Sequence, residues 1–232
     1  MSDGVERRVT VSVIIPALQE ARNIGAAIAS ARAGGADEIL VVDGGSTDGT
    51  LELARSADVV LSGTRGRARQ QNAGAERSRG DVLLFLHADC RLAMGACEQI
   101  RSALADPAVI GGCFCQRIDA MGWRYRVVER GNLLRVLVSG WMYGDQGLFI
   151  RREVFERLGG FPEVRLMEDW LLSRRLVRAG RTAVLPGPLL VSARRWQQAG
   201  LVRQTLRNWL LLMLASAGVP PDNLARWYPT VR

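Results

Sequence analysis

The sequence predicts a single α/β domain with a mostly parallel central β-sheet. Short runs rich in Val, Ile and Leu alternate with segments of helical spacing, which is typical of a parallel sheet covered by helices on both faces. The 232 residues suit one large domain, and 48% of them are hydrophobic, enough to fill a substantial core. No internal repeat, linker or low-complexity segment divides the chain.

The first half of the chain contains four predicted strands. They cover residues 9–15, 38–42, 58–61 and 81–86. Pro16 is expected to end the first strand, and a helix over residues 20–33 follows it. Ligands of such sheets bind outside the carboxyl ends of the strands, so we expect the chemistry directly after Ile15, Val42 and Leu86.

The second half of the chain is less regular. Strands are expected over residues 111–118 and 147–150, and helices over residues 167–179 and 201–217. The last helix contains a run of leucines that would suit a bilayer surface. We expect this run to pack against the core or in a homodimer, because both are commoner roles for such a helix.

The net charge of the sequence is +8, and all 31 basic residues are arginine. A guanidinium group binds phosphate and carboxylate through a rigid fork, so clustered arginines indicate an anionic ligand. Nucleic acid is one such ligand. However, aromatic residues make up only 6% of the chain and do not interleave with the arginines, as a platform for single strands requires. We therefore expect no nucleic-acid partner and keep an arginine-rich nucleic-acid-binding protein only as an alternative class.

The sequence also bears on the compartment. No N-terminal run has the pattern of a signal peptide, and the longest apolar patch, residues 209–217, is about half the length that spans a bilayer. The four cysteines lack the pattern of a disulfide scaffold, and Cys113 and Cys115 have no second pair to complete a zinc site. We expect a cytoplasmic protein without a transmembrane segment.

Polar residues follow three of the predicted strands. Glu20 comes after the first strand, Asp43 after the second, and His87 and Asp89 after the fourth. Carboxylates accept hydrogen bonds from nucleosides, and they share Mg²⁺ or Mn²⁺ with substrate phosphates. Taken alone, Asp43 is better explained as the cap of its own turn. The joint pattern is what points to a nucleotide site.

The order and spacing of these motifs resemble inverting family 2 glycosyltransferases. The matching segments are VSVIIP at 11–16, VVDGGSTDGT at 41–50, RQQNAG at 69–74, GDVLLFLHAD at 80–89, GLFIRREVF at 147–155 and ED at 168–169. The resemblance implies a nucleotide-diphospho-sugar transferase (GT-A-like) fold. It also divides the domain into a half at about 9–115 that binds the nucleotide sugar and an acceptor half at about 116–232.

The resemblance implies roles for particular residues. The positions expected to bind the nucleotide sugar are Pro16, Glu20, Asp43, Gly45, Arg69, Asn72, Ala88, Asp89, Asp145 and Gln146. Asp89 matches the second aspartate of a metal-binding Asp-x-Asp element, so a divalent metal, Mn²⁺ or Mg²⁺, is expected. Asp169 matches the general base, with Glu168 beside it. The implied reaction is displacement at the anomeric carbon of a UDP-sugar, with inversion and release of UDP.

Two positions depart from the family pattern. His87 replaces the first aspartate; residues 87 and 89 should point to the same side of an extended strand, so His87 is expected to act near the sugar or the metal. A hydrogen-bonded histidine at the strand end is the alternative. Ser192 replaces the glutamine of the Gln-x-x-Arg-Trp motif of processive members, so polymer synthesis is not expected. The residues expected at the diphosphate or an anionic acceptor are Arg194, Arg195 and Trp196, with a solvated pair of arginines as the alternative.

A narrower resemblance concerns the acceptor. The segments HAD at 87–89, YGDQG at 143–147, MEDW at 167–170 and SARRW at 192–196 are similar to a compact branch often labelled arsenosugar-biosynthesis type. That branch includes selenosugar synthases of the selenoneine pathway, which join selenophosphate to the sugar of UDP-N-acetylglucosamine or UDP-glucose. The resemblance implies a small anionic acceptor, with a polyprenyl phosphate at the membrane surface as the alternative.

The predicted start of the helix at 167–179 agrees with an ionised acceptor. Its dipole favours ionised carboxylates at Glu168 and Asp169, which weakens both as bases towards an alcohol. An acceptor that is already an anion needs no strong base. Asp145 and Gln146 are expected near the donor sugar or the acceptor, and a loop that hydrogen-bonds its own backbone is the alternative for both.

Overall fold

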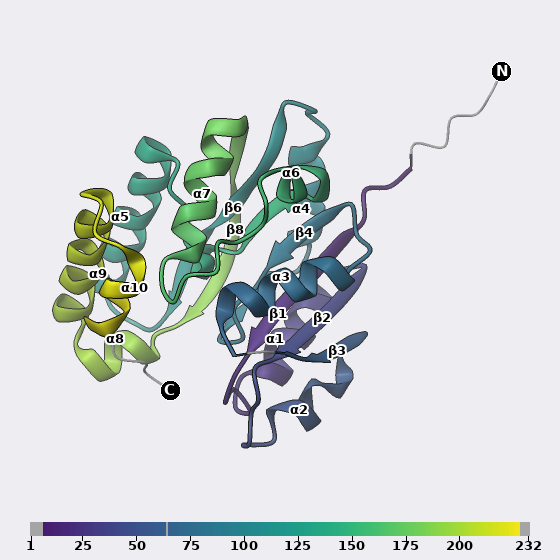
Figure 1. The fold of residues 1–232 in the computed structure, drawn as a ribbon, viewed down its shortest axis with the longest axis horizontal. Helices are drawn as coiled ribbons and strands as arrows, with labels where there is room; N and C mark the ends of the chain where they lie inside the picture. The colour runs from purple at the N-terminus through teal and green to yellow at the C-terminus, as the bar shows by residue number, and fades with distance from the viewer. Residues whose placement is uncertain (1–6, 64, 228–232) are drawn as a thin grey trace.

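The computed structural model describes residues 7–63 and 65–227, whose strands form one mixed eight-stranded sheet (Figure 1). The strand order is β3-β2-β1-β4-β7-β6-β8-β5. The strands are β1 (Val11–Ala17), β2 (Glu38–Asp43), β3 (Val59–Ser62), β4 (Val82–Phe85), β5 (Cys90–Arg91), β6 (Val109–Asp119), β7 (Leu148–Arg151) and β8 (Arg181–Ser192). One continuous sheet therefore joins the two halves of the predicted domain.

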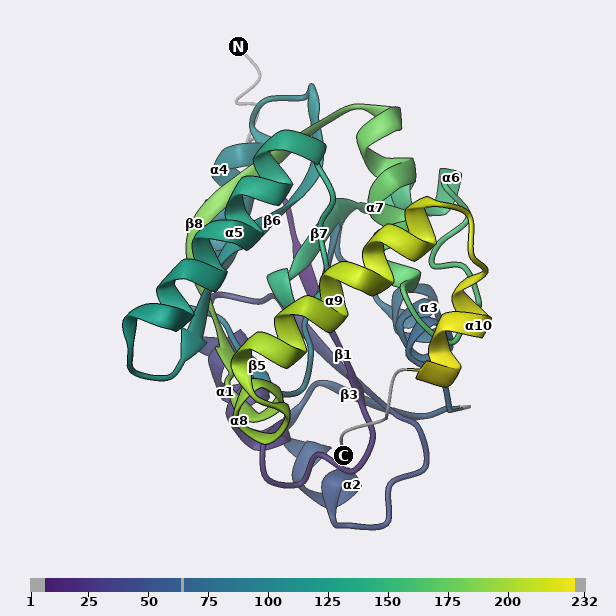
Figure 2. The same ribbon diagram turned by 90° about the vertical axis from the view of Figure 1, so that its left-hand side faces the viewer.

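Helices cover both faces of this sheet, as Figures 1 and 2 show. They are α1 (Ile24–Ala33), α2 (Thr50–Leu53), α3 (Arg67–Arg77), α4 (Ala96–Leu104), α5 (Trp123–Ser139), α6 (Arg152–Arg157), α7 (Glu168–Ala179), α8 (Arg194–Ala199), α9 (Leu201–Ser216) and α10 (Pro221–Leu224). Within the described ranges, no helix is both long and apolar enough to cross a membrane.

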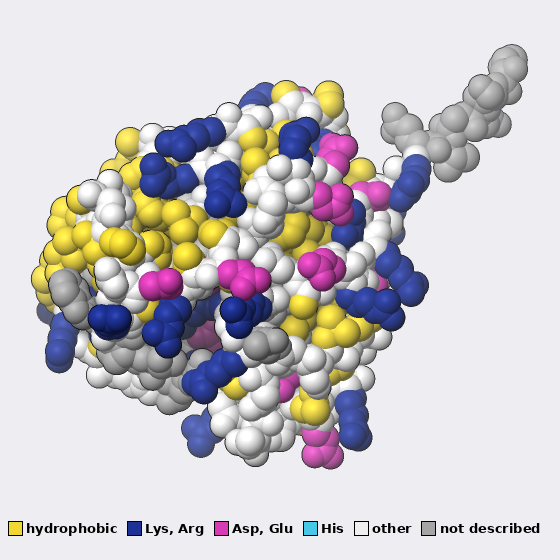
Figure 3. All heavy atoms as spheres, viewed as in Figure 1, with side chains coloured by type: hydrophobic (Ala, Val, Ile, Leu, Met, Phe, Trp, Pro, Cys, Tyr) yellow, Lys and Arg dark blue, Asp and Glu magenta, His cyan; other side chains and the backbone are white. Residues whose placement is uncertain are grey.

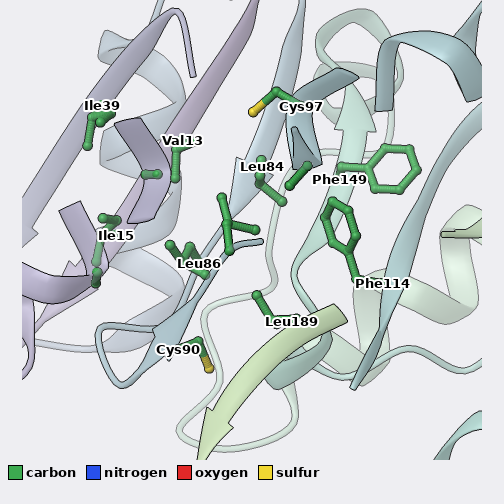
Figure 4. Packing of buried hydrophobic residues seen from close by; sticks show 14 of the residues in the cluster. Val13, Ile15, Ile39, Leu84, Leu86, Cys90, Cys97, Phe114, Phe149 and Leu189 are labelled. Carbon is green, nitrogen blue, oxygen red and sulfur yellow. The ribbon is translucent and has the colours of Figure 1, made fainter. Parts of the chain in front are cut away.

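Alternate residues of the central strands face opposite helical layers. Val13 and Ile15 of β1 pack in the layer that contains α1 and α4, whereas Ile14 packs in the layer that contains α3, α6 and α7. Figure 4 shows Val13, Ile15, Ile39 and Leu84 together in the first layer. Both faces of the strand are buried, which explains why its sequence is a continuous apolar run.

The strand directions place the site. β1 pairs in parallel with both β2 and β4, and β2 pairs in parallel with β3. β7 then lies antiparallel between β4 and β6, while β6 and β8 pair in parallel. The sheet is thus parallel on its N-terminal side, as predicted, and mixed beyond β4. The carboxyl ends of β2, β1 and β4 meet at one edge, where the predicted polar turns lie.

Several elements differ from the sequence prediction. β1 continues through Pro16 to Ala17, because a proline near the end of a strand costs little of the hydrogen-bonded ladder. α1 begins at Ile24, and residues 21–23 form a turn instead of the expected first helical turn. β8 was not predicted, because Pro186, Gly187 and Pro188 resemble a turn in the sequence.

Candidate functional site

A cleft of about 780 Å³ opens at the carboxyl ends of β1 and β4. Pro16 and Ala17 at the end of β1 form one side, and the turn that follows β4 forms another. The opposite wall comes from the first turn of α3 and from residues 163–166 and 225–226. The residues predicted from sequence that line the cleft are Pro16, Glu20, Arg69, His87, Ala88, Asp89 and Arg195.

The cleft carries charges of both signs with arginine in excess. The arginines in its lining are Arg65, Arg67, Arg69, Arg165, Arg195 and Arg226. The carboxylates are Glu20, Asp89 and Glu163, of which Glu163 accepts a hydrogen bond from Arg69 at 2.9 Å. Figure 3, viewed as Figure 1, shows arginine side chains beside carboxylates across the middle of the molecule. Such a lining suits a ligand that is anionic and also offers donors, as a nucleotide does.

Arg194 connects two of the cleft carboxylates. Its Nη2 atom donates to Oε1 of Glu20 at 3.0 Å and lies 3.6 Å from Oδ2 of Asp89. Glu20 also accepts from the Asn23 amide at 2.5 Å. The Arg194 side chain is 28% exposed and pairs with both carboxylates, whereas Arg195 is among the lining residues of the cleft.

The Asp43 side chain has two different surroundings. Its Oδ2 atom accepts from the backbone N–H groups of Gly45 at 2.9 Å and Ser46 at 2.8 Å, which caps the turn after β2. Gly45 has a φ of 92°, a conformation that glycine adopts without strain. The Oδ1 atom is buried and has no hydrogen-bond partner within residues 7–63 and 65–227. Asp43 therefore caps its own turn and still has one acceptor oxygen left.

Gln70 was missed by the sequence analysis. Its side-chain amide is buried and donates to the backbone oxygens of Ala17 at 2.8 Å and Val42 at 2.7 Å. A Cβ atom on Gly44 would lie 3.1 Å from the same amide nitrogen, so the turn after β2 packs closely against it. Gln70 therefore ties the ends of two strands together at the cleft. A glutamine inside an amphipathic helix gave no signal of this role.

The side chains of His87 and Asp169 both lie against Gly144. Residues 87–89 form a turn closed by the Cys90 N–H to His87 oxygen bond of 3.0 Å, so the expected extended geometry is wrong. A Cβ atom on Gly144 would overlap the Nε2 atom of His87 and lie 3.2 Å from Oδ2 of Asp169. The Gly144 N–H donates to that same Oδ2 atom at 2.6 Å. A side chain at position 144 would displace one of these two groups, so only glycine fits here.

Burial sets the protonation of His87. It lowers the pKa of His87 well below the usual 6.5, and the positive charges of Arg67 and Arg195 lower it further. The Nε2 atom is buried and makes no hydrogen bond inside the described part of the chain. The imidazole is therefore neutral at pH 7, with a ring nitrogen that is left for a ligand.

Glu168 is held by a residue that the sequence analysis did not select. Its side chain is buried and pairs with Arg67 at the start of α3, with Nη1 and Oε1 3.1 Å apart. Burial raises the pKa of Glu168, and the charge of Arg67 opposes that rise. Asp169 accepts the Trp170 N–H through Oδ1 at 2.7 Å. The described lining of the cleft contains neither carboxylate, and Asp169 contacts Gly144.

Three further predicted site residues have contacts with other parts of the chain. Asn72 donates to the Phe161 oxygen and accepts from the Phe161 N–H, both at 2.9 Å, so both polar atoms of its amide are engaged away from the cleft. Gln146 accepts from Arg135 at 2.8 Å and from the Tyr143 N–H at 3.0 Å, which is the local loop role considered as its alternative. Trp196 is buried in the core layer of α1 and α4. The Arg-Trp motif in the sequence did not indicate this burial.

Asp145 borders a second, much smaller cavity of about 60 Å³ between α5 and α9. Burial raises the pKa of Asp145, and its Oδ1 atom is buried without a partner in the described chain. Three other atoms around this cavity share that property: Arg135 Nε, Trp196 Nε1 and Thr205 Oγ1. The volume equals that of about two water molecules, so buried water fits these groups.

The residues present fit a divalent metal in part. Ligand atoms of His87, Asp89 and Cys90 lie within 4.8 Å of one another. An imidazole nitrogen and a carboxylate oxygen both suit Mn²⁺. Burial raises the pKa of the Cys90 thiol well above 9.0, and the charges of Asp89 and Asp145 raise it further, so the thiol is a poor ligand. His87 and Asp89 are the side chains that fit.

Known proteins resemble this chain in both sequence and fold. The model of glycosyl transferase family 2 matches residues 12–159. Glycosyltransferase AglE of Haloferax volcanii is 30% identical over 179 residues, 66% of this chain and 56% of that protein. Succinoglycan biosynthesis protein ExoA of Rhizobium meliloti is 28% identical over 230 residues, 85% of this chain and 69% of that protein. The chain thus spans only about half the length of AglE.

Two solved structures show the same architecture. The mannosyltransferase PcManGT of Pyrobaculum calidifontis, in complex with GDP-Man and Mn²⁺, has a TM-score of 0.69 and 23% identity over 95% of this chain and 69% of its own. TarS of S. aureus, in complex with UDP-GlcNAc, has a TM-score of 0.65 and 18% identity over 79% of this chain and 58% of its own. These likenesses confirm the GT-A-like α/β fold. Together with the match of the family model over residues 12–159, they show that the chain belongs to glycosyl transferase family 2.

Proposed function

We propose that this chain is an inverting, metal-dependent glycosyltransferase that transfers the sugar of a UDP-sugar to an anionic acceptor. The observation that carries the proposal is the cleft at the ends of β1 and β4, where Glu20 and Asp89 face an arginine-rich wall. A nucleoside diphosphate sugar needs acceptors for its base and ribose, and positive charge for its phosphates. Solved relatives of this fold with GDP-Man or UDP-GlcNAc in their complexes support a donor of this class.

The nucleoside is assigned to the end of the sheet near β1 and β2. There the unpartnered Oδ1 atom of Asp43 and the carboxylate of Glu20 are acceptors for imide or hydroxyl groups. Gly45 leaves the turn beside Asp43 open, since nothing lies within 4 Å of an added Cβ atom. Pro16 lines the same end of the cleft. These acceptors suit the base and the ribose of a nucleotide, and UDP is the nucleotide that the sequence resemblance implies.

The diphosphate is assigned to the first turn of α3. Backbone N–H groups at the start of a helix lack partners within the helix and attract anions. Arg67 and Arg69 extend from this turn into the lining of the cleft, and Arg195 lines it from the start of α8. Asp89 and His87 would hold the divalent metal, which when bound stabilises the negative charge that develops on the departing diphosphate.

The contacts of Glu168 and Asp169 support an acceptor that is already ionised. Glu168 is engaged by Arg67, and both oxygens of Asp169 accept backbone N–H groups. Neither side chain is arranged to take a proton from an alcohol in the cleft. Selenophosphate, the acceptor implied by the narrower sequence resemblance, needs no such base. Its selenium would form the bond to the anomeric carbon while the bond to the UDP oxygen breaks, and UDP leaves with the electron pair.

A lipid phosphate is the second candidate acceptor. It offers the same ionised nucleophile, and the exposed apolar sides of α5 and α9 favour work at a membrane surface. In this case a phosphate oxygen replaces selenium as the attacking atom. The arginines of the cleft suit both acceptors equally.

A UDP-release assay tests the proposal. Purified protein is mixed with UDP-N-acetylglucosamine or UDP-glucose and Mn²⁺ or Mg²⁺, with selenophosphate, with a short polyprenyl phosphate or with neither, and the products are followed by mass spectrometry. A selenium-bearing sugar formed together with UDP would fix the donor and the acceptor at once. Release that depends on the lipid phosphate alone would select the second candidate. Failure to bind any UDP-sugar would reject the proposed function.

A further inference from the structure

Helices α5 and α9 each leave an apolar stripe exposed. On α5 the exposed side chains are Trp123, Val127, Leu134, Leu137 and Val138, with exposed fractions between 55% and 78%. On α9 they are Val202, Leu206, Trp209, Leu210 and Met213, with exposed fractions between 49% and 65%. Spacings of three and four residues place the members of each stripe on one side of their helix.

The two stripes lie next to each other. Val128 of α5 and Leu212 of α9 line the same small cavity, so the helices are neighbours, and Figure 2 shows both on the side that faces the viewer. The opposite side of α9 is buried, since Leu211 and Ala215 pack with Trp170 and Leu224. The ten exposed residues form what we call the α5/α9 surface. Contiguous apolar surfaces of this kind mark interaction sites.

The exposed charged residues of α5 and α9 themselves are all positive, although Asp119 before α5 and Asp222 in α10 are exposed nearby in the sequence. α9 contains no Asp or Glu, and the only acidic residue of α5 is Glu129. Glu129 is occupied, because it pairs with Arg126 at 3.1 Å and accepts the Ile118 N–H at 2.6 Å. The exposed charged residues of the two helices are Arg124, Arg130 and Arg203. The surface is therefore apolar with a fringe of positive charge.

We infer that the α5/α9 surface docks on a lipid bilayer with anionic headgroups. An amphipathic helix at a bilayer buries its apolar side at the boundary of headgroups and acyl chains and keeps cations beside the headgroups. Trp123 and Trp209 have the amphipathic rings that are enriched at this depth. A two-fold contact with a second copy would bring the same arginines together without carboxylates to pair them. The charge pattern therefore favours lipid over a homodimer.

Docking in this way orients the cleft. The chain leaves α9 at Ser216, passes through α10 and reaches Arg226, which lines the cleft. The helix that enters the membrane surface thus leads within ten residues to the wall of the proposed donor site. Any acceptor carried by the bilayer would be delivered close to this wall. The inference concerns binding alone, and it holds for either of the two acceptors considered above.

Vesicle flotation tests the inference on the full chain without any substrate. The vesicles contain phosphatidylcholine alone or phosphatidylcholine mixed with phosphatidylglycerol. We expect the protein to float with the mixed vesicles and to be released by high salt. The double change Trp123→Ser with Trp209→Ser should weaken vesicle binding by about tenfold or more, because two large apolar side chains lose their burial. Arg130→Gln with Arg203→Gln should remove the preference for phosphatidylglycerol.

Leu53 and Arg55, which lie outside the α5/α9 surface, give matched controls. Leu210 of α9 and Leu53 of α2 are both 49% exposed, and Figure 1 shows α2 at the opposite side of the molecule from α9. Leu210→Gln should weaken binding by about threefold or more, whereas Leu53→Gln should leave it unchanged. Arg55→Gln, beside α2, is the control for charge. Melting curves confirm that each variant is folded.

Three outcomes would overturn the inference. The first is wild-type protein that does not float with anionic vesicles. The second is flotation that Leu210→Gln and the Trp123 and Trp209 changes leave intact. The third is a homodimer in sedimentation analysis that dissociates in the double tryptophan variant while no vesicle binding is seen, which would assign the surface to contacts between copies. UDP binding measured in parallel stays unchanged in all of these variants if the proposed function is correct, so the two proposals can fail separately.

Discussion

The Nη2 atom of Arg194 lies 3.0 Å from the Oε1 atom of Glu20, although 174 residues separate the two in the sequence. The same guanidinium lies 3.6 Å from the Oδ2 atom of Asp89. The segment after β8 therefore holds the polar turns that follow β1 and β4. Arg194 thus holds the two carboxylates of the cleft in position. The ends of β1 and β4 alone do not fix these positions.

Removing this guanidinium should disturb donor binding. We expect Arg194→Gln to lower the affinity for UDP about tenfold, because hydrogen bonds to charged groups contribute about 1.5–3 kcal/mol and Glu20 would lose one. Titration calorimetry with UDP and Mn²⁺ measures this change. Arg55→Gln, an exposed arginine that is not among the lining residues of the cleft, is the control. An unchanged affinity in Arg194→Gln would show that the contact does not position the donor site.

Two variants of Asp43 separate its role in the turn after β2 from its proposed role in UDP binding. Asp43→Asn keeps an oxygen that accepts the N–H groups of Gly45 and Ser46, but it removes the charge. We expect UDP to bind about tenfold more weakly, since the second oxygen can no longer accept, while the melting temperature changes little. Asp43→Ala should lower both. Unaltered UDP binding in Asp43→Asn would assign the residue to the turn alone.

The metal prediction rests on Asp89. We expect Asp89→Ala to lower turnover by at least about a thousandfold, since a metal at a leaving group supplies several kcal/mol of charge stabilisation. Mn²⁺ binding in the presence of UDP should be lost, and the fold should remain, because the side chain is partly exposed. Asp119→Ala, on the exposed end of β6, is the control. Near-normal turnover in Asp89→Ala would contradict the metal role.

Gly144 is predicted to be a spacer between His87 and Asp169. Gly144→Ala would place a methyl group against Nε2 of His87 and 3.2 Å from Oδ2 of Asp169, so one of the two must move. Displacements of about 1 Å in a catalytic site cost about 100-fold in rate, and we expect kcat to fall by that factor. Steady-state kinetics with saturating donor measure it.

The matched control for this change is Gly131 in α5. An added Cβ atom there meets nothing within 4 Å. Gly131→Ala should leave kcat unaltered and stabilise the protein by up to about 1 kcal/mol, because alanine favours the helix interior over glycine. Equal activity of the two alanine variants would mean that the site tolerates a shift of His87, and that Gly144 is not a spacer.

The sequence predicted the parts of the fold that depend on the pattern of neighbouring residues. The apolar runs of β1, β2 and β4 identified buried parallel strands, and the rule for strand ends located the cleft that contains Pro16, Glu20 and Asp89. α5 was missed because its apolar residues face both the core and the solvent, so no single apolar side is visible. Long-range packing cannot be seen in such periodicities.

The contacts of three predicted site residues were not visible in the sequence for the same reason. Asn72 lies in a segment that matches the family, and its amide binds the backbone of Phe161, 89 residues away, whereas Gln146 binds the backbone of its own loop at Tyr143. Trp196 follows two arginines and was expected beside them, but the turn of α8 directs it into the core. The position of a polar side chain depends on which loop packs against it. The residue that packs against it can be a hundred positions away in the sequence, as Arg67 is from Glu168.

The ion pair of Arg67 and Glu168 is expected to stabilise the fold. Glu168 is buried and Arg67 is 36% exposed, so Arg67→Leu leaves a buried carboxylate without its cation. We expect a loss of about 1–3 kcal/mol in the free energy of unfolding at pH 7, less than for a fully buried pair. Adding Glu168→Gln should restore most of it, because the unpaired charge is then gone. Urea unfolding of the four proteins in this double-mutant cycle measures the coupling.

The pH dependence of this loss has a definite sign. Burial raises the pKa of Glu168 above its usual 4.5 in the folded protein, so its contribution to stability is fully present below pH 4.5 and is lost as the pH rises through the folded value. Arg67 opposes that rise, and Arg67→Leu removes the opposition. The deficit of Arg67→Leu relative to wild type should therefore be small near pH 4.5 and grow towards neutrality. A deficit that is equal at both pH values would mean that Arg67 stabilises the protein through packing of its alkyl chain, and not through the charge of Glu168.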